Sequence, residues 1–242
     1  MKKNLKWLLI IIGAILVVLT GLGLYYFYPM LVMAPAKTGE IPGTNIYAVK
    51  NMMGTLYFIK TDDGYILIDA GSNVKKLVAS LKKSNIDCDA VKWIFITHSD
   101  YDHVAGLNLF PNARIYMSVD EFPLINGAVN RSNSGGNTLP AGIEINAVIP
   151  LLDGQMLSYK GTNIECIQVP GHTIGSMVYL VDGKYLFTGD VFMVNKNALY
   201  VHPFTMDTEL AEKTIKQLRD TIRGSSMVLT SHYGYYNNLN RQ

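Results

Sequence analysis

The chain has 242 residues, of which 49% are hydrophobic and only 17% are charged, and its formal net charge is +2 at pH 7. Globular proteins average about a quarter charged residues, and the apolar excess of this chain lies in its first 36 positions. This composition excludes a disordered chain, a collagen, a coiled coil and a polytopic membrane protein. Three of the 21 basic residues precede position 37. The rest of the chain therefore has 18 basic and 19 acidic residues, which nearly balance. Since phosphate binding usually requires a basic surplus, we expect no nucleic-acid partner.

An uncharged apolar segment at 7–28 follows three lysines. A bilayer core about 30 Å thick needs roughly 20 apolar residues in a helix, so we predict a single transmembrane signal-anchor at 7–28. The basic N-terminus at 1–6 then stays in the cytoplasm, and the rest of the chain lies outside it. The alternative is a cleaved signal peptide, because Ala34-Pro35-Ala36 has the form of a cleavage site, and the domain is then secreted.

Residues 29–44 contain several prolines and glycines and are predicted to be a linker, followed by one domain at 45–242. Strands are predicted at 46–49, 55–60, 65–69, 93–97, 114–118, 147–151, 155–158, 163–169, 177–181, 184–187 and 227–230. Helices are predicted at 73–81, 119–125 and 208–222. This order indicates an α+β fold whose sheets have outer faces covered by helices. Residues 126–142 are rich in Gly, Asn and Ser, which is typical of a mobile flap and equally of an ordinary surface loop.

The two cysteines, Cys88 and Cys166, lie 78 positions apart and form no Cys-x-x-Cys motif. We expect two separate buried thiols. A disulfide between them is the alternative if the domain is exported.

Histidines and aspartates gather after the predicted strands. Imidazole and carboxylate are ligands of borderline and hard divalent ions. Because seven donors exceed what one cation accepts easily, the pattern favours two ions that share a carboxylate. The predicted metal ligands are His98, Asp100, Asp102, His103, His172, Asp190 and His232. The fifth histidine, His202, either reaches the site from the loop after Asp190 or is an ordinary surface histidine.

Several motifs resemble those of one enzyme family. The segment THSDYDH at 97–103 resembles the THxHxDH signature of the metallo-β-lactamase-fold hydrolases. DGYILIDAG at 63–71, PGHTIGS at 170–176 and LFTGD at 186–190 resemble further motifs of the family, and so does SH at 231–232. They occur in the family order and cover most of the chain after the apolar segment. The resemblance implies a four-layer αβ/βα sandwich with two metal ions at one edge of its sheets.

The resemblance also implies a role for each ligand. One ion takes His98, Asp100 and His172, and Asp190 bridges both ions. The other takes Asp102, His103 and His232, while Asp69 orients the ligand loop. Zinc is the metal that the family implies.

Position 100 departs from the pattern, because the family usually has a histidine there and this chain has Asp100. Three carboxylates and one hydroxide give two divalent ions a formally neutral site, and the extra oxygen ligand shifts the metal preference toward Mn²⁺ or Fe²⁺, with zinc still the first expectation. The alternative is that Asp100 does not bind and only one ion is held.

The expected function is a hydrolase in which a metal-bridging hydroxide attacks an ester, thioester, lactone, amide or phosphodiester bond of a small molecule. Asp102 is the expected catalytic residue, since it can orient the hydroxide or pass a proton to the leaving group. Tyr233, Tyr235 and Tyr236 either form a pocket wall or cover the sheet edge. A mononuclear iron redox enzyme of the same fold and an inactive metal-binding receptor are the alternatives. The sequence indicates neither the substrate nor the oligomeric state.

Overall fold

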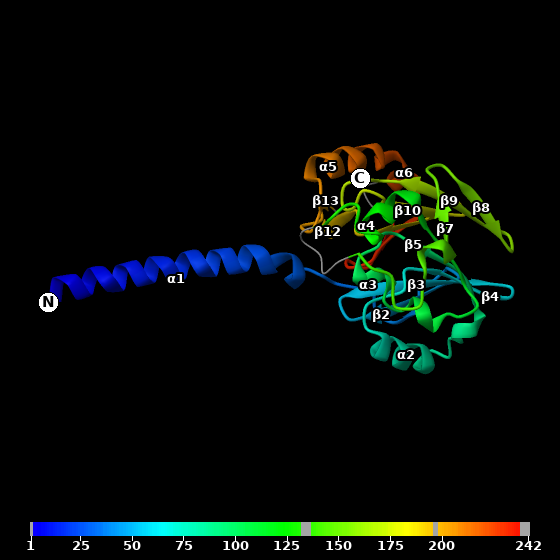
Figure 1. Cartoon of the computed structure of the whole chain (residues 1–242), viewed down its shortest axis with the longest axis horizontal. Coiled ribbons are helices and arrows are strands. Elements are labelled where there is room, and N and C mark those ends of the chain that lie inside the picture. Colours follow the sequence, from blue (N-terminus) through cyan, green and yellow to red (C-terminus); the bar gives the residue numbers. More distant parts are fainter. Residues whose placement is uncertain (1, 132–136, 196–197, 238–242) are drawn as a thin grey trace. The chain divides into compact units, whose positions relative to one another are not determined.

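The computed structural model describes residues 2–131, 137–195 and 198–237, and the chain forms two compact units, Met1–Met33 and Ala34–Gln242. The first unit is one continuous helix, α1 (Lys2–Leu31), drawn in blue in Figure 1. Its segment Leu5–Leu24 has a mean hydropathy of 2.7 and is long and apolar enough to cross a membrane, a test that an N-terminal signal sequence also passes. The helix begins at Lys2 and ends at Leu31, so it extends beyond the predicted span 7–28 at both ends.

The second unit contains a seven-stranded sheet with its strands in chain order. Strands β4 to β7 are parallel, and the others pair antiparallel. Alternation gives this sheet two apolar faces: in β3, Tyr57 and Ile59 join one buried cluster while Leu56 and Phe58 join another. Its strands are β1 (Gly39–Glu40), β2 (Ile46–Asn51), β3 (Gly54–Thr61), β4 (Gly64–Ile68), β5 (Val91–Ile96), β6 (Arg114–Ser118) and β7 (Val148–Leu151).

A six-stranded sheet packs against the first, in the order β15-β14-β11-β10-β9-β8. A separate hairpin of β12 and β13 follows β11 in the chain. The sequence prediction missed β1, β12, β13 and β15, because these strands are short and alternate weakly. The strands are β8 (Met156–Tyr159), β9 (Thr162–Gln168), β10 (Met177–Val181), β11 (Tyr185–Gly189), β12 (Phe192–Asn195), β13 (Ala198–Val201), β14 (Met227–Thr230) and β15 (Tyr235–Asn237).

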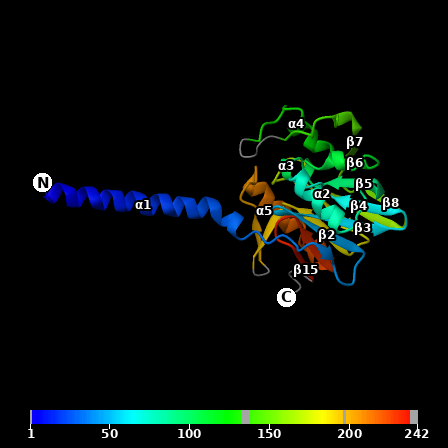
Figure 2. The same cartoon turned by 90° about the horizontal axis from the view of Figure 1, so that it is seen from below.

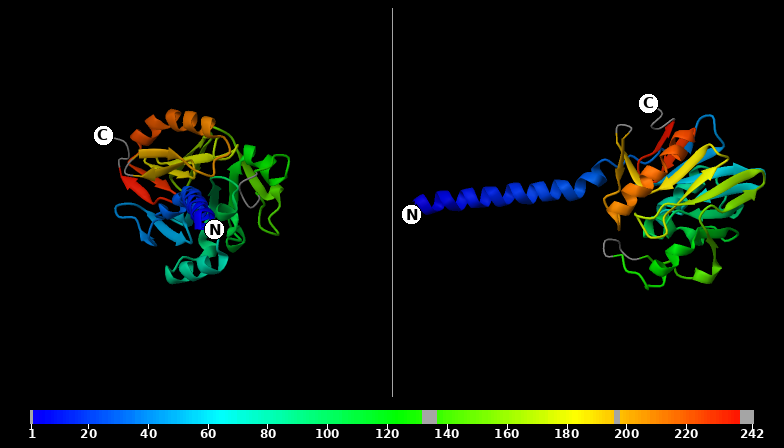
Figure 3. Two further views of the ribbon diagram at one scale, coloured as in Figure 1. Left: turned by 90° about the vertical axis from the view of Figure 1, so that its left-hand side faces the viewer. Right: turned by 90° about the horizontal axis from the view of Figure 1, so that it is seen from above.

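Helices cover both outer faces, which completes four layers. Helix α2 (Val74–Lys83) lies on the first sheet (Figure 2) and buries Leu77 and Leu81 there. Helices α5 (Thr208–Gln217) and α6 (Arg219–Gly224) lie on the second sheet (Figure 3, right). Short helices α3 (Tyr101–Val104) and α4 (Phe122–Ile125) connect strands of the first sheet. The predicted helix at 208–222 is therefore two helices, with Leu218 at the junction.

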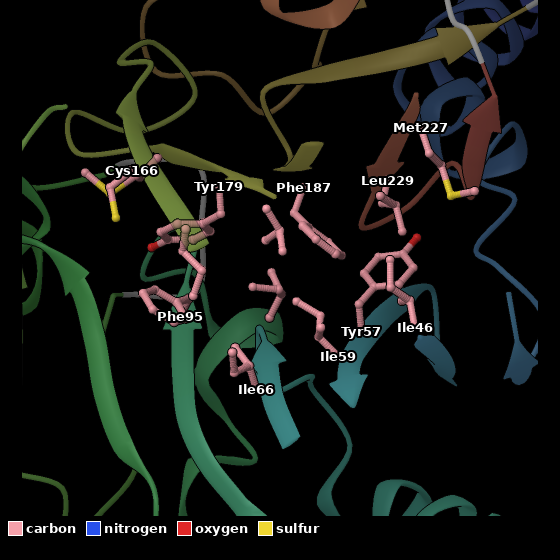
Figure 4. Close-up of a cluster of buried hydrophobic side chains, with 14 of the residues drawn as sticks. Ile46, Tyr57, Ile59, Ile66, Phe95, Cys166, Tyr179, Phe187, Met227 and Leu229 are labelled. Carbon is pink, nitrogen blue, oxygen red and sulfur yellow. The ribbon is translucent and has the colours of Figure 1, made fainter. Parts of the chain in front are cut away.

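The inner core lies between the sheets. Figure 4 shows side chains from the first sheet, such as Tyr57 and Phe95, facing side chains from the second, such as Tyr179 and Phe187. Ring pairs lock this interface: the Tyr57 and Phe187 centroids are 5.5 Å apart, and those of Phe95 and Tyr179 are 5.1 Å apart. Burial of large side chains here holds the two sheets face to face, which positions the loops at their ends.

Part of the predicted linker belongs to the compact unit. Ala36 and Ile41 are buried, and the Ala36 amide donates to Thr55 Oγ1 at 2.9 Å. Strand β1 pairs with β2 just before Ile41. Two apolar side chains and a strand pairing hold residues 34–44 on the domain, although their composition is typical of a tether.

Two other expectations concern loops and thiols. Both cysteines are free: Cys166 is buried in the inner core, whereas Cys88 is half-buried. The disulfide alternative is therefore absent from this structure. In the loop at 126–142, positions 132–136 lie outside the described residues, and the rest forms turns and irregular segments.

Candidate metal centre

The predicted ligands follow strands of both sheets at one edge of the sandwich. His98 comes after β5, His172 after β9, Asp190 after β11 and His232 after β14. Together with Asp100, Asp102 and His103 they form overlapping groups in which all ligand atoms lie within 4.8 Å of one another. The structure therefore brings together all seven side chains that the sequence singles out.

The segment after β5 changes conformation within six residues. The backbone is extended at Asp100, the N-cap of α3, and becomes helical from Tyr101. Because side chains two apart in an extended segment lie on one side, His98 and Asp100 point the same way. The helical turn then redirects Asp102 and His103. Because the backbone changes from extended to helical, one short segment supplies ligands to two neighbouring cation positions.

Asp190 reaches this segment because of the glycine before it. Gly189 has φ +54°, and a Cβ built on it would lie 2.7 Å from Thr97 Cβ. No side chain fits between the end of β11 and the end of β5. Glycine at 189 therefore sets the close approach of Asp190 to the histidines.

The Asp190 carboxylate lies between two groups of ligands. Its Oδ2 is 3.0 Å from His232 Nε2, 3.6 Å from His103 Nε2 and 3.8 Å from His172 Nε2. On one side, Asp100 Oδ2 lies 3.5 Å from His172 Nε2 and 3.4 Å from His98 Nε2. On the other side, the Oδ2 atom of Asp102, whose side chain is 42% exposed, lies 3.4 Å from His232 Nε2. These distances fit two adjacent cation positions that share Asp190.

Hydrogen bonds orient the imidazoles toward the centre. Asp69 Oδ2 lies 2.8 Å from His103 Nδ1, and Asp69 Oδ1 accepts the Thr97 amide hydrogen at 2.8 Å. The Met53 carbonyl oxygen lies 2.8 Å from His232 Nδ1. A proton held on each Nδ1 leaves the Nε2 lone pair for a metal. Asp69, which the resemblance assigns to orienting the ligand loop, thus contacts both the loop and a ligand.

The charges of the cluster shift its pKa values in a consistent pattern. Burial disfavours the charged forms, but the acidic neighbours outweigh it and raise the pKa of His232 to about 10 and that of His103 well above its usual value. Burial lowers the pKa of His172 to about 4. The neighbouring histidines overcome burial and hold the pKa of Asp190 well below its ordinary range, and His103 lowers that of Asp102 to about 2. A concentrated set of carboxylates therefore attracts cations, either protons or metal ions.

The unpartnered atoms test whether metal ions fit. His98 Nε2, His103 Nε2 and Asp190 Oδ1 are buried and have no hydrogen-bond partner among the described residues. Each such buried polar atom costs about 1–3 kcal/mol when left unpaired. Nitrogen and carboxylate ligands that converge without partners fit one or two divalent cations.

Sequence reasoning missed Glu121, which holds two ligand loops together. Its buried carboxylate accepts hydrogen bonds from the Ser99 amide at 2.7 Å and the Gly175 amide at 3.0 Å. The hydroxyl groups of Ser99 and Thr173 donate to it as well. An isolated glutamate inside a predicted short helix carries no signal of this role, which depends on partners 22 to 54 positions away.

Sequence reasoning also missed Arg131. Its buried guanidinium forms an ion pair with Asp100 Oδ1, lies 3.3 Å from His172 Nε2 and donates to the Phe204 carbonyl. Asn137 Nδ2 donates to the same Asp100 oxygen at 2.8 Å. Both residues come from the glycine-rich loop, whose composition gave no sign of a charged contact with the ligands.

The remaining aromatic candidates separate into two kinds. His202 and Tyr233 are 2% and 3% exposed, so the surface alternative for His202 is wrong. Their rings lie 6.2 Å apart, and the Tyr233 hydroxyl has no hydrogen-bond partner among the described residues. Tyr235 and Tyr236 belong to β15 and cover the edge of the second sheet.

Comparison with known proteins gives a family match and several relatives. Residues 50–229 match the family described as the metallo-beta-lactamase superfamily. A probable polyketide biosynthesis zinc-dependent hydrolase, PksB of Bacillus subtilis, is 30% identical over 128 residues, which cover 52% of this chain and 48% of PksB. A probable metallo-hydrolase of Streptococcus pyogenes is 24% identical over 222 residues, 88% of this chain and 86% of that protein. The chain thus spans about half the length of PksB but most of the streptococcal relative.

Solved structures share the fold. A B3 metallo-beta-lactamase with an active-site glutamic acid superposes with a TM-score of 0.61 at 20% identity, covering 82% of this chain and 84% of that one. An archaeal superfamily protein from Sulfolobus tokodaii gives a TM-score of 0.59 at 19% identity, with 81% and 83% covered. At these identities the likeness establishes the α+β sandwich and no more.

Proposed function

Because the chain belongs to the metallo-beta-lactamase superfamily, we propose that it is a membrane-anchored hydrolase that uses two divalent metal ions on a small-molecule substrate. The observation that carries this proposal is the place of Asp190. Its Oδ2 lies within 4.0 Å of histidines from two separate ligand groups. A shared carboxylate between two sets of nitrogen and oxygen ligands is the arrangement that a two-ion site requires.

Each ligand has a position in this proposal. His98, Asp100 and His172 hold one ion, and Asp102, His103 and His232 hold the other. Bound divalent ions lower the pKa of a water molecule toward neutrality and polarise the oxygen of the scissile bond. Zinc is the first candidate because two relatives are named zinc-dependent hydrolases.

Asp102 is the side chain best placed to move a proton. Its carboxylate is the accessible one of the cluster, with 42% of the side chain exposed, whereas Asp190 is only 5% exposed. A carboxylate with a pKa of about 2 is ionised at neutral pH, so it accepts a hydrogen bond from a nucleophilic water. Asp102 therefore orients the nucleophile in this proposal, while Asp190 is confined to holding ions.

Thioesters are the first substrates to test. One relative, whose match covers 55% of this chain, is named atrochrysone carboxyl ACP thioesterase, and another is named hydroxyacylglutathione hydrolase. Ester, lactone, amide and phosphodiester bonds complete the set, since the same chemistry serves each of them. The anchor places the site outside the cytoplasm in this proposal, with the lysines of the N-terminus inside.

A single-ion enzyme is the alternative that one observation favours. Arg131 contacts both Asp100 and His172, which are two of the three ligands assigned to one ion. A guanidinium at that position supplies a fixed positive charge in place of a metal. The number of ions per chain separates the two proposals.

Elemental analysis of the full-length protein, together with a thioester hydrolysis assay, tests this function. We expect about two ions per chain, activity that a chelator removes, and loss of both in Asp190→Asn. Asp62→Asn makes the same change at an exposed aspartate and should leave both unchanged. One ion per chain that rises to two in Asp100→His would favour the single-ion enzyme. Protein without metal, or hydrolysis that survives chelation, would refute the proposal.

A further inference from the structure

We propose that His202 is an additional metal ligand, for the ion held by His172 and Asp190. This inference rests on the proposed function and extends its ligand set beyond the seven residues that the sequence motifs contain. It assigns to the residue directly after β13 the imidazole that the family places at position 100, where this chain has Asp100.

His202 has the environment of a ligand without its ion. The side chain is buried, and neither ring nitrogen has a hydrogen-bond partner among the described residues. A buried imidazole normally satisfies at least one nitrogen, since an unpaired polar atom costs about 1–3 kcal/mol. By comparison, His103 and His232 each have an Nδ1 held by a nearby oxygen. Two nitrogens without a partner among the described residues, on one buried ring, are the arrangement expected of a metal ligand.

The ring lies beside two of the assigned ligands. Ligand atoms of His172, Asp190 and His202 all lie within 4.8 Å of one another, and His202 Nε2 is 4.0 Å from Asp190 Oδ2. The His172 and His202 rings meet edge to face with centroids 4.9 Å apart. A cation between three such atoms moves each of them by about 1 Å or less to reach the roughly 2.0–2.2 Å of a zinc–ligand bond.

The backbone fixes this position. The segment after His202 is hydrogen-bonded to the loop that carries His172: the Met206 amide donates to the carbonyl oxygens of Gly171 and His172 at 3.1 Å, and the Asp207 amide donates to Gly171 at 3.0 Å. The Phe204 carbonyl also accepts from Arg131. The His202 segment and the His172 loop are thus held as one piece, which favours a shared ligand role over a chance approach.

Asp100 leaves room for this ligand. Its Oδ1 is taken by Arg131 and Asn137, so only Oδ2 faces His98 and His172. An aspartate that is paired with a guanidinium donates less charge to a cation than a free one. An extra imidazole at this ion compensates for the loss and moves the site toward zinc, which nitrogen ligands suit, and away from Mn²⁺.

The test measures metal binding in the full-length protein and in His202→Ala. Zinc and manganese affinities are determined by competition with a chelator, and Co²⁺-loaded protein gives a visible absorption spectrum that depends on the ligands. We expect the zinc affinity of one ion to fall at least about tenfold, the preference for zinc over manganese to shrink, and the Co²⁺ spectrum to change. Tyr200→Ala, an exposed change on β13 two positions before His202, should alter none of these.

Each other result has a distinct meaning. Unchanged zinc affinity with an unchanged Co²⁺ spectrum would overturn the assignment and leave the proposed function intact. A weaker affinity with an unchanged spectrum in the loaded variant would also overturn it, because His202 would then only position the loop. Absence of metal from the native protein would instead refute the proposed function itself.

Discussion

At the scale of single residues, Arg131 alters the charge of the metal centre. In the proposed two-ion site, three aspartates and one hydroxide would leave two divalent ions formally neutral, and the guanidinium paired with Asp100 would restore one positive charge. The effect of Asp100 therefore cannot be judged without Arg131. The two residues act as a pair, although they lie 31 positions apart and only tertiary structure joins them.

Arg131→Gln should tighten metal binding. The substitution removes a positive charge beside a cation and leaves Asn137 as the described donor to Asp100 Oδ1, so we expect at least about tenfold higher affinity for one ion. Titration calorimetry with zinc measures this affinity in the native protein and in the variant. Arg114→Gln, which removes the same charge from an exposed position, is the matched control. Weaker binding in Arg131→Gln would mean that Arg131 chiefly holds Asp100 in place.

The cysteines should differ in their reactivity with alkylating reagents. Burial raises the pKa of Cys166 to about 12, and it also raises that of the half-buried Cys88. The thiolate is the reactive form, so at pH 8 we expect no labelling of Cys166 and slow labelling of Cys88 that accelerates as the pH rises. Mass spectrometry after iodoacetamide treatment should show two labels once the protein is unfolded. Labels that appear only after reduction would reveal a disulfide.

At the scale of elements, the site depends on how strands end. Strand β11 ends at Gly189, where a positive φ and the proximity of Thr97 leave no room for a side chain. Strand β5 ends in an extended segment followed by one helical turn, which gives ligands to two positions. The ends of the strands, more than their interiors, carry the chemistry.

Gly189→Ala should therefore disrupt the site, and Gly183→Ala is its matched control. Gly183 lies in the turn before the same strand, also has a positive φ of 65°, and no described atom lies within 4 Å of an added Cβ. The control should lose about 1–2 kcal/mol of unfolding free energy from backbone strain alone. Gly189→Ala adds a clash with Thr97 and should also lose metal. Equal behaviour of the two variants in denaturation and metal content would contradict this account.

At the scale of the whole molecule, the two sheets bring distant segments to one edge. The inner core joins residues from Ile46 to Leu229, so the ligands at 98–103 meet His232 only when both sheets are packed. A substitution that leaves a cavity in this core would weaken the packing of the two sheets and so disturb the positions of the metal ligands. The unit Met1–Met33 contains the apolar segment Leu5–Leu24.

The apolar segment predicts membrane attachment of the whole chain. We expect the full-length protein to remain in the membrane fraction after salt and carbonate washing, since about 20 buried apolar residues anchor a helix firmly. A chain that lacks residues 2–31 should be released. Intact-mass measurement of the washed protein detects cleavage: a mature N-terminus near Lys37 would show that the segment is a signal peptide.

The sequence predicted the chemistry and most of the strands, because both leave local signals. His98, Asp102 and His103 occur within six positions, and the strands at 114–118, 177–181 and 227–230 have the predicted bounds. Apolar runs and tight polar motifs persist along the chain, since they arise from burial and ligand geometry. The seven candidate ligands could thus be named without coordinates.

Only the tertiary structure decided which residues join them. Arg131, Glu121 and His202 lie in segments without a motif, and their contacts reach partners tens of positions away. Long-range burial and charge pairing depend on how the sheets pack, which no local pattern encodes. The sequence by itself therefore determined the fold family and a metal-binding chemistry. The packing of the two sheets decided the charge of the metal centre and which other residues surround the ligands.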